Sequence, residues 1–386
     1  MSDQDVSAGR RLGIVGAGQL AKMTANAAYG LGCRVNVVER NDFSPAVGLA
    51  ANALVGDWND PQVLKSLAAE VDVLTLENEF VDAESLAAVE AAGHTVLPSA
   101  QCIARVQDKL VQKSTLAEAG LPVPRFAAAE SKDDVVAAAA QWGWPLLLKA
   151  RRDGYDGKGN ATIREEADID AAWEQLGGQG LLVEEFFDFA TELAIIITRG
   201  RDGGAVDYPL VESVQKDHVC HLVRAPAPVG EDVRARAVEV ARAALAAVGG
   251  VGSFGVEMFL ARDGHIAINE LAPRVHNTGH YSIEACATSQ FENHVRAVLG
   301  WPLGSTAMRQ PAAVMVNMLG VGPGSGIPSG FEQALAIEGA HVHVYGKTVS
   351  GKGRKMGHVT ALGSTVAEAE EIAQQAAGCI TFGEAQ

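Results

Sequence analysis

The segment Ser253–His280 reads SFGVEMFLARDGHIAINELAPRVHNTGH and decides the fold that we expect for the whole chain. Two short apolar runs, Phe254–Leu260 and Ile266–Leu271, lie on either side of the letters ARDGH. An Asp-Gly dipeptide between two apolar runs is a strong local signal for a β-hairpin. The sequence therefore predicts an antiparallel pair of strands whose turn is centred on Asp263 and Gly264.

That turn position places Glu257 directly opposite Glu270 on the two strands. Two like charges that face each other across a strand pair destabilise it, so we expect a cation between them. Carboxylate oxygens favour a hard ion such as Mg²⁺, which proteins hold with one or two carboxylates and with nucleotide phosphates. The alternative is a solvated sheet face on which both acids point into water.

The loop that follows, Leu271–His280, is rich in side chains that donate hydrogen bonds. Pro273 disfavours regular structure, and Arg274, His276 and Asn277 come directly after it. A guanidinium group binds a planar carboxylate or carbonate through two parallel hydrogen bonds. We therefore expect these three side chains to hold a small oxyanion beside the metal site. The two histidines of the loop are four residues apart, but no HExxH pattern accompanies them to favour zinc.

Length and composition limit the function classes. The chain has 386 residues, a hydrophobic content of 48% and a formal net charge of −16. These values fit two or three globular domains and argue against nucleic acid and anionic membrane surfaces as partners. The five cysteines show no CxxC spacing, which is typical of reduced cytoplasmic thiols. No apolar run approaches the roughly 18 residues of a membrane span, and the N-terminal residues do not resemble a signal peptide.

The first hundred residues alternate between predicted strands and predicted helices. Arg11–Val15 is a predicted strand, the letters GAGQLA begin a helix, and Val35–Val38 is a second strand that ends at Glu39. A glycine turn at a helix N-terminus binds phosphate through free backbone N–H groups. The pattern GxGxxA with an acid about 20 residues later also fits NAD binding, so an NAD-dependent oxidoreductase is an alternative.

A further predicted strand, Val71–Leu76, ends at Glu77, and Thr95–Leu97 is expected to be another strand of the same domain. Open α/β sheets bind ligands at the carboxyl ends of their strands. Glu77 is therefore placed where a ligand of the first domain would bind.

The second region begins with a predicted helix, Lys132–Trp142, and a predicted strand, Pro145–Ala150. The strand carries Lys149 within an apolar run, and such a lysine either pairs with an anion or extends to the edge of the sheet. The loop Arg151–Asn160 reads RRDGYDGKGN. Its glycines leave the backbone free to close over phosphate groups through the amides.

Two predicted strands, Leu181–Phe187 and Thr191–Thr198, and a long amphipathic helix, Asp232–Val248, come before the hairpin. After it, the glycine-rich basic segment Gly346–Lys355 precedes a closing helix, Val366–Ala377. The sequence thus predicts further strands and one more basic loop beyond the metal hairpin.

Four motifs, taken in order, give the chain a resemblance to a known family: GAGQLAKM, RRDGYDGKGN, NELAPRVHNTGH, and YGK followed by GRKMGH. Together they resemble the ATP-grasp ligases and, within them, the 5-(carboxyamino)imidazole ribonucleotide synthases of purine biosynthesis. The resemblance implies an α/β and α+β fold with a Rossmann-like N-terminal domain over residues 1–107. An ATP-grasp domain would follow over residues 108–300, with a lid subdomain at about 122–190. A small β-rich C-terminal domain over residues 301–386 would complete the substrate site.

The resemblance also implies an activity. ATP would phosphorylate bicarbonate to carboxyphosphate, whose carboxyl group passes to the exocyclic amine of 5-aminoimidazole ribonucleotide. ATP would be a substrate, Mg²⁺ the cofactor, and the protein a homodimer. The alternative within the fold is a formate-dependent ligase that acts on glycinamide ribonucleotide, although RRDGYDGKGN and GRKMGH argue against it. A catalytically inactive nucleotide-binding module is a further alternative.

The resemblance assigns individual residues to four roles. ATP would be bound by Lys109, Lys149, Gly154, Tyr155, Asp156, Gly157, Lys158, Gly159, Asn160, Glu184, Glu185, Phe186, Phe187, Glu192, Gln215, Asn269 and Glu270. The metal ligands would be Glu257 and Glu270. The catalytic residues would be Arg274, His276, Asn277, Asp156 and Lys355. The ribonucleotide would be bound by Gly18, Gln19, Leu20, Glu77, Tyr155, Lys347 and Arg354.

The sequence departs from the family pattern at two places. Gln215 stands where family members often have a histidine near the nucleotide. The C-terminal loop reads GKGRK where the family often has RPGRK, so one arginine is missing and Lys352 is a partial substitute.

Overall fold

The computed structural model describes residues 9–154 and 159–384. The predicted site residues Tyr155, Asp156, Gly157 and Lys158 therefore lie outside the described residues. The described chain forms two four-stranded sheets, one nine-stranded sheet and one two-stranded sheet. The proposed domain bounds of 1–107, 108–300 and 301–386 stay a prediction, and the sheets are described here as the structure has them.

The N-terminal sheet is fully parallel and has the strand order β3-β2-β1-β4. Its strands are β1 (Arg11–Val15), β2 (Arg34–Glu39), β3 (Asn52–Val55) and β4 (Val73–Leu76). Its helical segments are α1 (Gln19–Gly30), η1 (Val47–Leu49), α2 (Pro61–Ala68), α3 (Ala83–Ala91) and α4 (Ala100–Val106). The order of the strands reverses between β1 and β4, and such a switch point is where open α/β sheets bind ligands. The glycine turn after β1 and Glu77 after β4 both lie there.

The expected strand at Thr95–Leu97 is wrong. This segment makes an isolated bridge between Val96 and Leu74, with one backbone hydrogen bond on each side. The next ladder bond to β4 would come from the backbone N–H of Ser99, which instead begins α4 as its N-cap. The chain then turns into α4 instead of extending the sheet.

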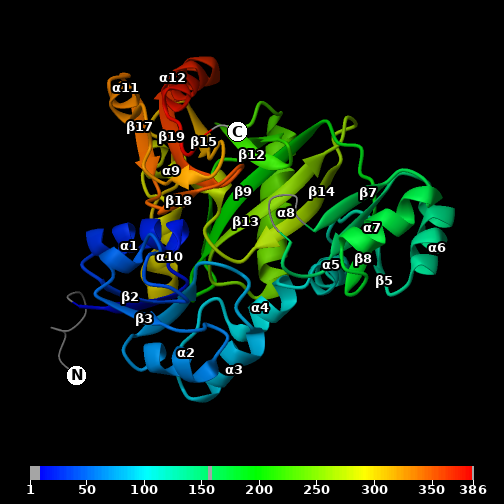
Figure 1. Ribbon diagram of the computed structural model, residues 1–386, viewed down its shortest axis with the longest axis horizontal. Coiled ribbons are helices and arrows are strands. Elements are labelled where there is room, and N and C mark those ends of the chain that lie inside the picture. Colours follow the sequence, from blue (N-terminus) through cyan, green and yellow to red (C-terminus); the bar gives the residue numbers. More distant parts are fainter. Residues whose placement is uncertain (1–8, 155–158, 385–386) are drawn as a thin grey trace.

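The second four-stranded sheet is antiparallel, with the order β5-β8-β6-β7. It contains β5 (Phe126–Ala129), β6 (Leu146–Ala150), β7 (Asn160–Ile163) and β8 (Leu181–Glu185), with α6 (Lys132–Trp142), η2 (Glu166–Asp168) and α7 (Ile169–Gln175). We call these elements the lid lobe, which forms the right-hand lobe of Figure 1. The strand that we expected to run through Phe187 ends at Glu185, so Phe186 and Phe187 lie in the connection to the next sheet.

The central sheet has nine strands, ordered β14-β13-β9-β11-β12-β15-β19-β17, with β10 paired to β9. Its strands are β9 (Thr191–Arg199), β10 (Ala205–Asp207), β11 (Val211–Lys216), β12 (Val219–Ala225), β13 (Gly252–Leu260), β14 (Ile266–Ala272), β15 (Ala312–Leu319), β17 (Ala340–Val344) and β19 (Lys355–Gly363). The C-terminal strands β15, β19 and β17 thus continue the same sheet that contains the hairpin β13–β14. A small pair, β16 (Gly324–Ser325) and β18 (Val349–Ser350), lies outside it.

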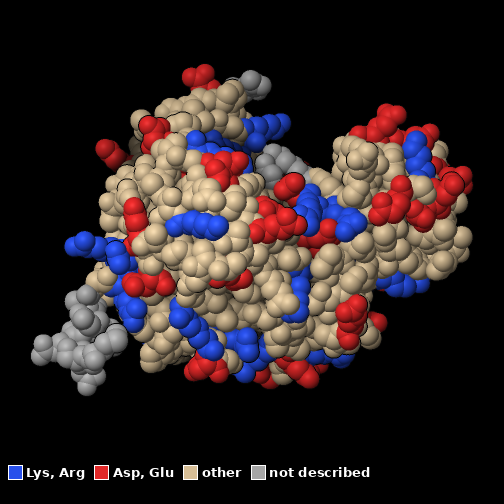
Figure 2. Space-filling model, turned by 90° about the horizontal axis from the view of Figure 1, so that it is seen from below, with Lys and Arg blue, Asp and Glu red and all other residues tan. Residues whose placement is uncertain are grey.

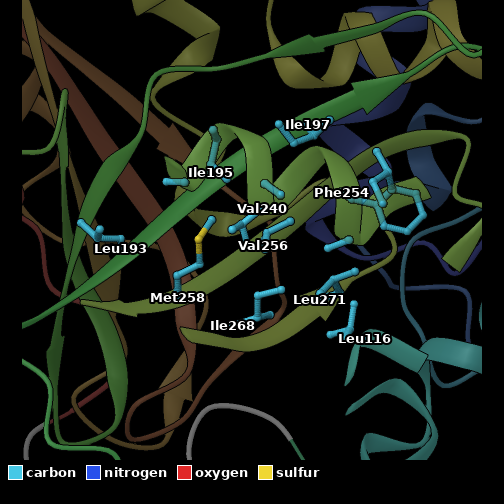
Figure 3. Close-up of a cluster of buried hydrophobic side chains, with 14 of the residues drawn as sticks. Leu116, Leu193, Ile195, Ile197, Val240, Phe254, Val256, Met258, Ile268 and Leu271 are labelled. Carbon is cyan, nitrogen blue, oxygen red and sulfur yellow. The ribbon is translucent and has the colours of Figure 1, made fainter. Parts of the chain in front are cut away.

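Helices pack on the central sheet and share an apolar core with it. They are α5 (Lys109–Glu118), α8 (Glu231–Val248), η3 (Asn277–Gly279), α9 (Ser282–Ala285), α10 (Gln290–Leu299), α11 (Phe331–Leu335) and α12 (Val366–Cys379). Figure 3 shows Val240 of α8 and Leu116 of α5 in one buried cluster with side chains of β9, β13 and β14. This apolar packing fixes the hairpin β13–β14 against α5 and α8.

The hairpin places Glu257 opposite Glu270, as the sequence predicts. The strand pairs nearer the turn, however, have a different register. The strands end at Leu260 and Ile266, so the turn is centred on Asp263 alone and the pairs near it are offset by one residue. A β-bulge between Glu257 and Met258 removes the offset, and Asn269 is the extra residue. The predicted pairing of the two acids is therefore confirmed, whereas the predicted turn centre is wrong.

The surface of the molecule carries mixed charges. On the face seen in Figure 2, Lys and Arg side chains lie scattered among Asp and Glu side chains. Within the described ranges, no helix is both long and apolar enough to cross a membrane.

Candidate active site

Glu257 and Glu270 form the centre of the candidate site. Burial and the charge of Glu270 raise the pKa of Glu257. Burial also favours the neutral form of Glu270, but the ion pair with the Lys109 ammonium outweighs it and lowers the pKa of Glu270. The two opposed carboxylates therefore differ in proton affinity, and they would share a bound cation.

The donor set fits magnesium better than zinc. The two opposed side chains offer oxygen atoms, which Mg²⁺ prefers, and Mg²⁺ usually takes the rest of its shell from water and substrate phosphates. Across the described residues, no cluster of three or more His, Cys, Asp and Glu side chains could hold a metal by itself. The pair Glu257 and Glu270 therefore fits an ion that is shared with a nucleotide.

Lys149 has the anionic partner that its place on an apolar strand predicts. Its side chain is 5% exposed, and its Nζ lies 2.7 Å from Oε1 of Glu184, which is fully buried. The Nζ of Lys113 lies 2.6 Å from the other oxygen of Glu184. Burial favours neutral Glu184, but the two ammonium groups outweigh it and lower its pKa. Lys113 is a site residue that the sequence analysis missed, although it follows Lys109 by one helical turn.

The other residues predicted to bind the nucleotide lie along β8, β9 and β11. Glu185 pairs with Arg125, and Phe187 stacks on Phe259 with ring centroids 5.8 Å apart. Burial raises the pKa of Glu192, and a hydrogen bond from Gln215 offsets only part of that rise. The structure thus brings Glu192 and Gln215 together, and their contacts with ATP stay predictions.

The glycine-rich loop is described only at its ends. Gly154 lines the cavity discussed below, and Gly159 has φ of 85°, a backbone conformation that favours glycine. Asn160 pairs with Lys149 across β6 and β7. The loop therefore begins and ends beside the buried lysine.

Arg274 is bound by a carboxylate of the N-terminal sheet. Its Nη2 donates to Oε1 of Glu79 at 2.9 Å, and its Nε donates to the other oxygen of Glu79. The carboxylate partner of Arg274 is therefore Glu79, and not Glu270, which lies four residues before it in the sequence. This bidentate pair joins the loop after β14 to the segment after β4.

His276 and Asn277 are also engaged. The Nδ1 of His276 lies 2.9 Å from Oγ1 of Thr278, and its Nε2 lies 3.6 Å from Oε1 of Glu257. Burial and the charge of Arg274 lower the pKa of His276 to about 3, so the imidazole is neutral near pH 7. Asn277 exchanges two amide hydrogen bonds with Asn317, at 2.9 and 2.7 Å. Both side chains are thus fixed close to the metal pair.

Two carboxylates fill the glycine turn after β1. Glu77 accepts hydrogen bonds from the backbone N–H groups of Gly18 and Leu20, and Glu39 accepts one from Ala17 at 3.0 Å. A Cβ atom at Gly18 would collide with Glu77, so the close approach requires glycine. An NAD pyrophosphate would need these same N–H groups. The turn therefore disfavours NAD binding and presents Glu77 to a ligand instead.

The substitution Glu77→Gln tests this burial through pH. Burial raises the pKa of Glu77 to about 7, against hydrogen bonds from Gly18 and Leu20. Above the ordinary value of 4.5 the unfolded chain releases this proton first, so Glu77 destabilises the fold increasingly until about pH 7. We expect the difference in Tm between variant and wild type to shift in favour of the variant from about pH 5 to about pH 8. A constant difference, equal to that of the exposed control Glu84→Gln, would contradict the prediction.

The basic C-terminal loop lies against the same turn. Nζ of Lys22, on α1, donates to the carbonyl oxygens of Val344 and Tyr345, both at 3.1 Å. Lys347 lies over the Tyr345 ring at 5.9 Å and donates to the Lys355 carbonyl oxygen at 2.8 Å. These contacts join α1, which begins at the predicted substrate residue Gln19, to the segment that leads into Lys347.

Arg354 and Gln19 complete this region. Nη1 of Arg354 donates to the carbonyl oxygen of Val349 at 2.7 Å, and most of the side chain is exposed. Gln19 is the first residue of α1. Lys355 is the first residue of β19. Its positive charge acts against the rise in the pKa of Glu257, so the end of the basic loop is electrostatically coupled to the opposed acid pair.

A cavity of about 240 Å³ connects these parts. Its lining includes Lys109 and Glu270 from the metal site, Gly154 from the glycine-rich loop, and Glu79, the partner of Arg274. One space therefore adjoins Glu270 of the acid pair, the start of the loop expected over phosphates, and the carboxylate partner of the arginine expected to bind an oxyanion.

The fold and this site define an ATP-grasp protein, and three family models match the chain in succession. They are a ribonucleotide synthetase preATP-grasp domain over residues 10–107, an ATP-grasp domain over 114–291, and a phosphoribosylaminoimidazole carboxylase C-terminal domain over 313–372. The chain belongs, within that class, to the N5-carboxyaminoimidazole ribonucleotide synthase family. A relative of that name from Synechococcus elongatus is 41% identical over 372 residues, which are 96% of this chain and 94% of the relative.

Solved structures agree with the family. Carboxyaminoimidazole ribonucleotide synthase from Aspergillus clavatus, complexed with ATP, is 37% identical and has a TM-score of 0.88, covering 96% of this chain and 98% of that one. A second structure of the Aspergillus clavatus enzyme, with ADP and 5-aminoimidazole ribonucleotide, also has 37% identity and a TM-score of 0.88. It covers 95% of this chain and 98% of the solved one. The family is one of ATP-dependent ligases that form ADP.

Proposed function

We propose that this chain carboxylates 5-aminoimidazole ribonucleotide with ATP and bicarbonate, through carboxyphosphate, in purine biosynthesis. The observation that carries the proposal is that Glu270, which faces Glu257 across the hairpin, lines one cavity together with Lys109 and Glu79. The solved relative that holds ADP and 5-aminoimidazole ribonucleotide supports the choice of substrate. Mg²⁺, bicarbonate and the role of each residue are also part of the proposal. The residue roles are argued below from the contacts within this chain.

The first step needs the triphosphate to be held and its charge to be neutralised. We assign Lys109 and Lys149 to the phosphates, because the charges of both ammonium groups act on Glu270, the acid that would hold the ion beside the phosphates. Glu257 and Glu270 would hold Mg²⁺, which when bound neutralises charge on the transferring phosphoryl group. The loop Gly154–Asn160 would cover the phosphates and exclude water.

The second group positions bicarbonate. Bicarbonate is a weak nucleophile, so the protein contributes mainly by placing it in line with the γ-phosphate. Arg274 offers guanidinium N–H groups, and neutral His276 and the Asn277 side-chain amide can each donate a hydrogen bond to the oxyanion. All three follow directly after β14, which carries Glu270.

The third group receives the ribonucleotide between α1 and the C-terminal loop. We assign Gln19 and Glu77 to its polar groups and Lys347 and Arg354 to its 5′-phosphate. Figure 1 shows that α1 lies beneath the C-terminal strands, so a small ligand there would contact both ends of the chain. We assign Asp156, which lies outside the described residues, and Lys355 as catalytic residues.

Arg354→Ala tests the phosphate contact. A guanidinium lost from a phosphate site removes a charge-assisted hydrogen bond, so KM for the ribonucleotide should rise about tenfold or more. The KM for ATP should not change. The control is Arg34→Ala, which removes an exposed arginine at the start of β2, away from the glycine turn. If the variant kept both constants of the wild type, the phosphate site would lie elsewhere.

ADP formation with each small substrate omitted in turn tests the whole proposal. We expect ADP release to need ATP, Mg²⁺ and bicarbonate, and to be stimulated by 5-aminoimidazole ribonucleotide. ADP release that instead needs formate and glycinamide ribonucleotide would favour the related ligase. No ADP under any condition would favour an inactive nucleotide-binding module.

The assembly and the location of the protein are the last parts of the proposal. The homodimer is implied by the family resemblance, and the measured mass of the protein in solution would test it. The cytoplasmic location is supported by five free cysteines, of which Cys33, Cys102, Cys220 and Cys286 are buried. Free thiols are typical of a reducing compartment.

A further inference from the structure

The β-bulge at Asn269 is what makes the metal pair possible. Between the turn and the bulge, Met258 faces Ile268, and beyond it Glu257 faces Glu270. If the inner register continued, Glu257 would face Asn269, and Glu270 would point to the opposite face of the sheet, because side chains alternate along a strand. The extra residue therefore converts a pair of one acid and one amide into a pair of two acids.

The bulged strand is the edge strand of the central sheet, so its outer backbone groups need partners from elsewhere. Gln112 of α5, which is 3% exposed, supplies two of them. Its Oε1 accepts from the Leu271 N–H at 2.8 Å, and its Nε2 donates to the Leu271 carbonyl oxygen at 3.1 Å. Nε2 also donates to the carbonyl oxygen of Val106 at 2.9 Å. One carboxamide thus takes the place of a neighbouring strand directly after Glu270.

Lys113, one residue later on α5, binds the bulge itself. Its ammonium donates to the carbonyl oxygen of Asn269 at 3.2 Å and pairs with Glu184 of the lid lobe. The side chain is 2% exposed. Burial lowers the pKa of Lys113 to about 8, although Glu184 acts against this. The same lysine therefore joins the extra residue of the bulge to the partner of Lys149.

We propose that Gln112 and Lys113 are positioning residues that hold the bulge in register and so set the spacing of Glu257 and Glu270 for a divalent ion. The inference rests on the proposed function for the identity of that ion. Neither residue needs to touch the ion or the substrate. Both act on backbone atoms at or beside Glu270, where a small shift would move a ligand oxygen out of position.

Gln112→Met tests the inference, because it removes three hydrogen bonds and keeps the length of the side chain. Mn²⁺ binding to the full protein with ADP, followed by electron paramagnetic resonance, should show a dissociation constant raised about tenfold or more. Activity with Mg²⁺ should fall more than activity with Mn²⁺, since Mg²⁺ demands nearly ideal octahedral geometry. The matched control is Gln101→Met, an exposed glutamine on α4.

Three further variants keep the test decisive if Gln112→Met does not fold. Gln112→Glu keeps the acceptor for the Leu271 N–H and should give a smaller rise in the Mn²⁺ constant. Lys113→Met should raise that constant as well, and Lys113→Arg, which can still donate to Asn269 and Glu184, should restore it.

The outcomes separate this inference from the proposed function. A lower Tm with an unchanged Mn²⁺ constant and an unchanged ratio of Mg²⁺ to Mn²⁺ activity would mean a merely structural role and would overturn the inference. A wild-type protein that binds no Mn²⁺ with ADP, or that forms ADP without a divalent ion, would overturn the proposed metal site instead.

Discussion

Glu270→Gln is expected to lower ADP-forming turnover by on the order of a hundredfold or more. The substitution keeps the size of the side chain but removes one anionic ligand from the ion that neutralises the transferring phosphoryl group. It also leaves the Lys109 ammonium without its carboxylate partner. Turnover should be measured as ADP release at saturating Mg²⁺ with all substrates present.

A second measurement separates this loss from unfolding. Removing the charge of Glu270 loses its attraction to Lys109 but also relieves its repulsion of Glu257, so we expect only a small change in Tm. The control is Glu370→Gln on α12, which removes an acid that pairs with Arg224 away from the site. Near-normal ADP release by the Glu270 variant would disprove the metal assignment.

The hairpin shows how far local sequence can predict this site. The apolar runs and the Asp-Gly dipeptide indicate an antiparallel pair, and the pairing of Glu257 with Glu270 is found. The register that gives this pairing is not encoded near the turn, because the turn itself is offset by one residue. The bulge that corrects the offset is held by Gln112 and Lys113, about 150 residues earlier in the chain.

The ion pairs of the site show the same limit. An apolar strand around Lys149 indicates that an anion must be near, but nothing local identifies Glu184 as that anion. Arg274 and Glu79 are separated by 195 residues, and they meet because the segment after β4 faces the loop after β14. Local patterns therefore predict which residues need a partner, and the packing of the sheets decides which partner they have.

The fold as a whole is predicted well where motifs carry it. The glycine turn, the buried lysine strand, the acid pair and the basic loop occur in family order, and the ATP-grasp fold with its flanking domains is confirmed. The shared nine-stranded sheet was not predicted, because pairing of β12 with β15 joins segments far apart in sequence. Such pairing leaves no local pattern.

Arg274→Ala is expected to abolish bicarbonate-dependent phosphate release while ATP with Mg²⁺ binds at near-native affinity. Carboxyphosphate forms only when bicarbonate is held in line with the γ-phosphate, and a guanidinium fork is suited to that oxyanion. In the structure Glu79 engages Nε and Nη2 of this guanidinium and fixes its orientation, so bicarbonate would be bound through the remaining N–H groups of Nη1 and Nη2. The pair would keep Arg274 directed at the cavity that Glu79 and Glu270 both line.

The competing explanation is that Arg274 only fastens the loop after β14 to the N-terminal sheet. Glu79→Gln distinguishes the two roles, because it weakens the fastening but leaves the arginine in place. If Arg274 binds bicarbonate, Glu79→Gln should keep substantial bicarbonate-dependent phosphate release, whereas Arg274→Ala should lose it at near-native ATP affinity. Both variants weaken the pair, so Tm should fall in both under either explanation. If the pair is only a fastening, both variants should lose phosphate release and ATP affinity to a similar degree, and that result would refute the bicarbonate role.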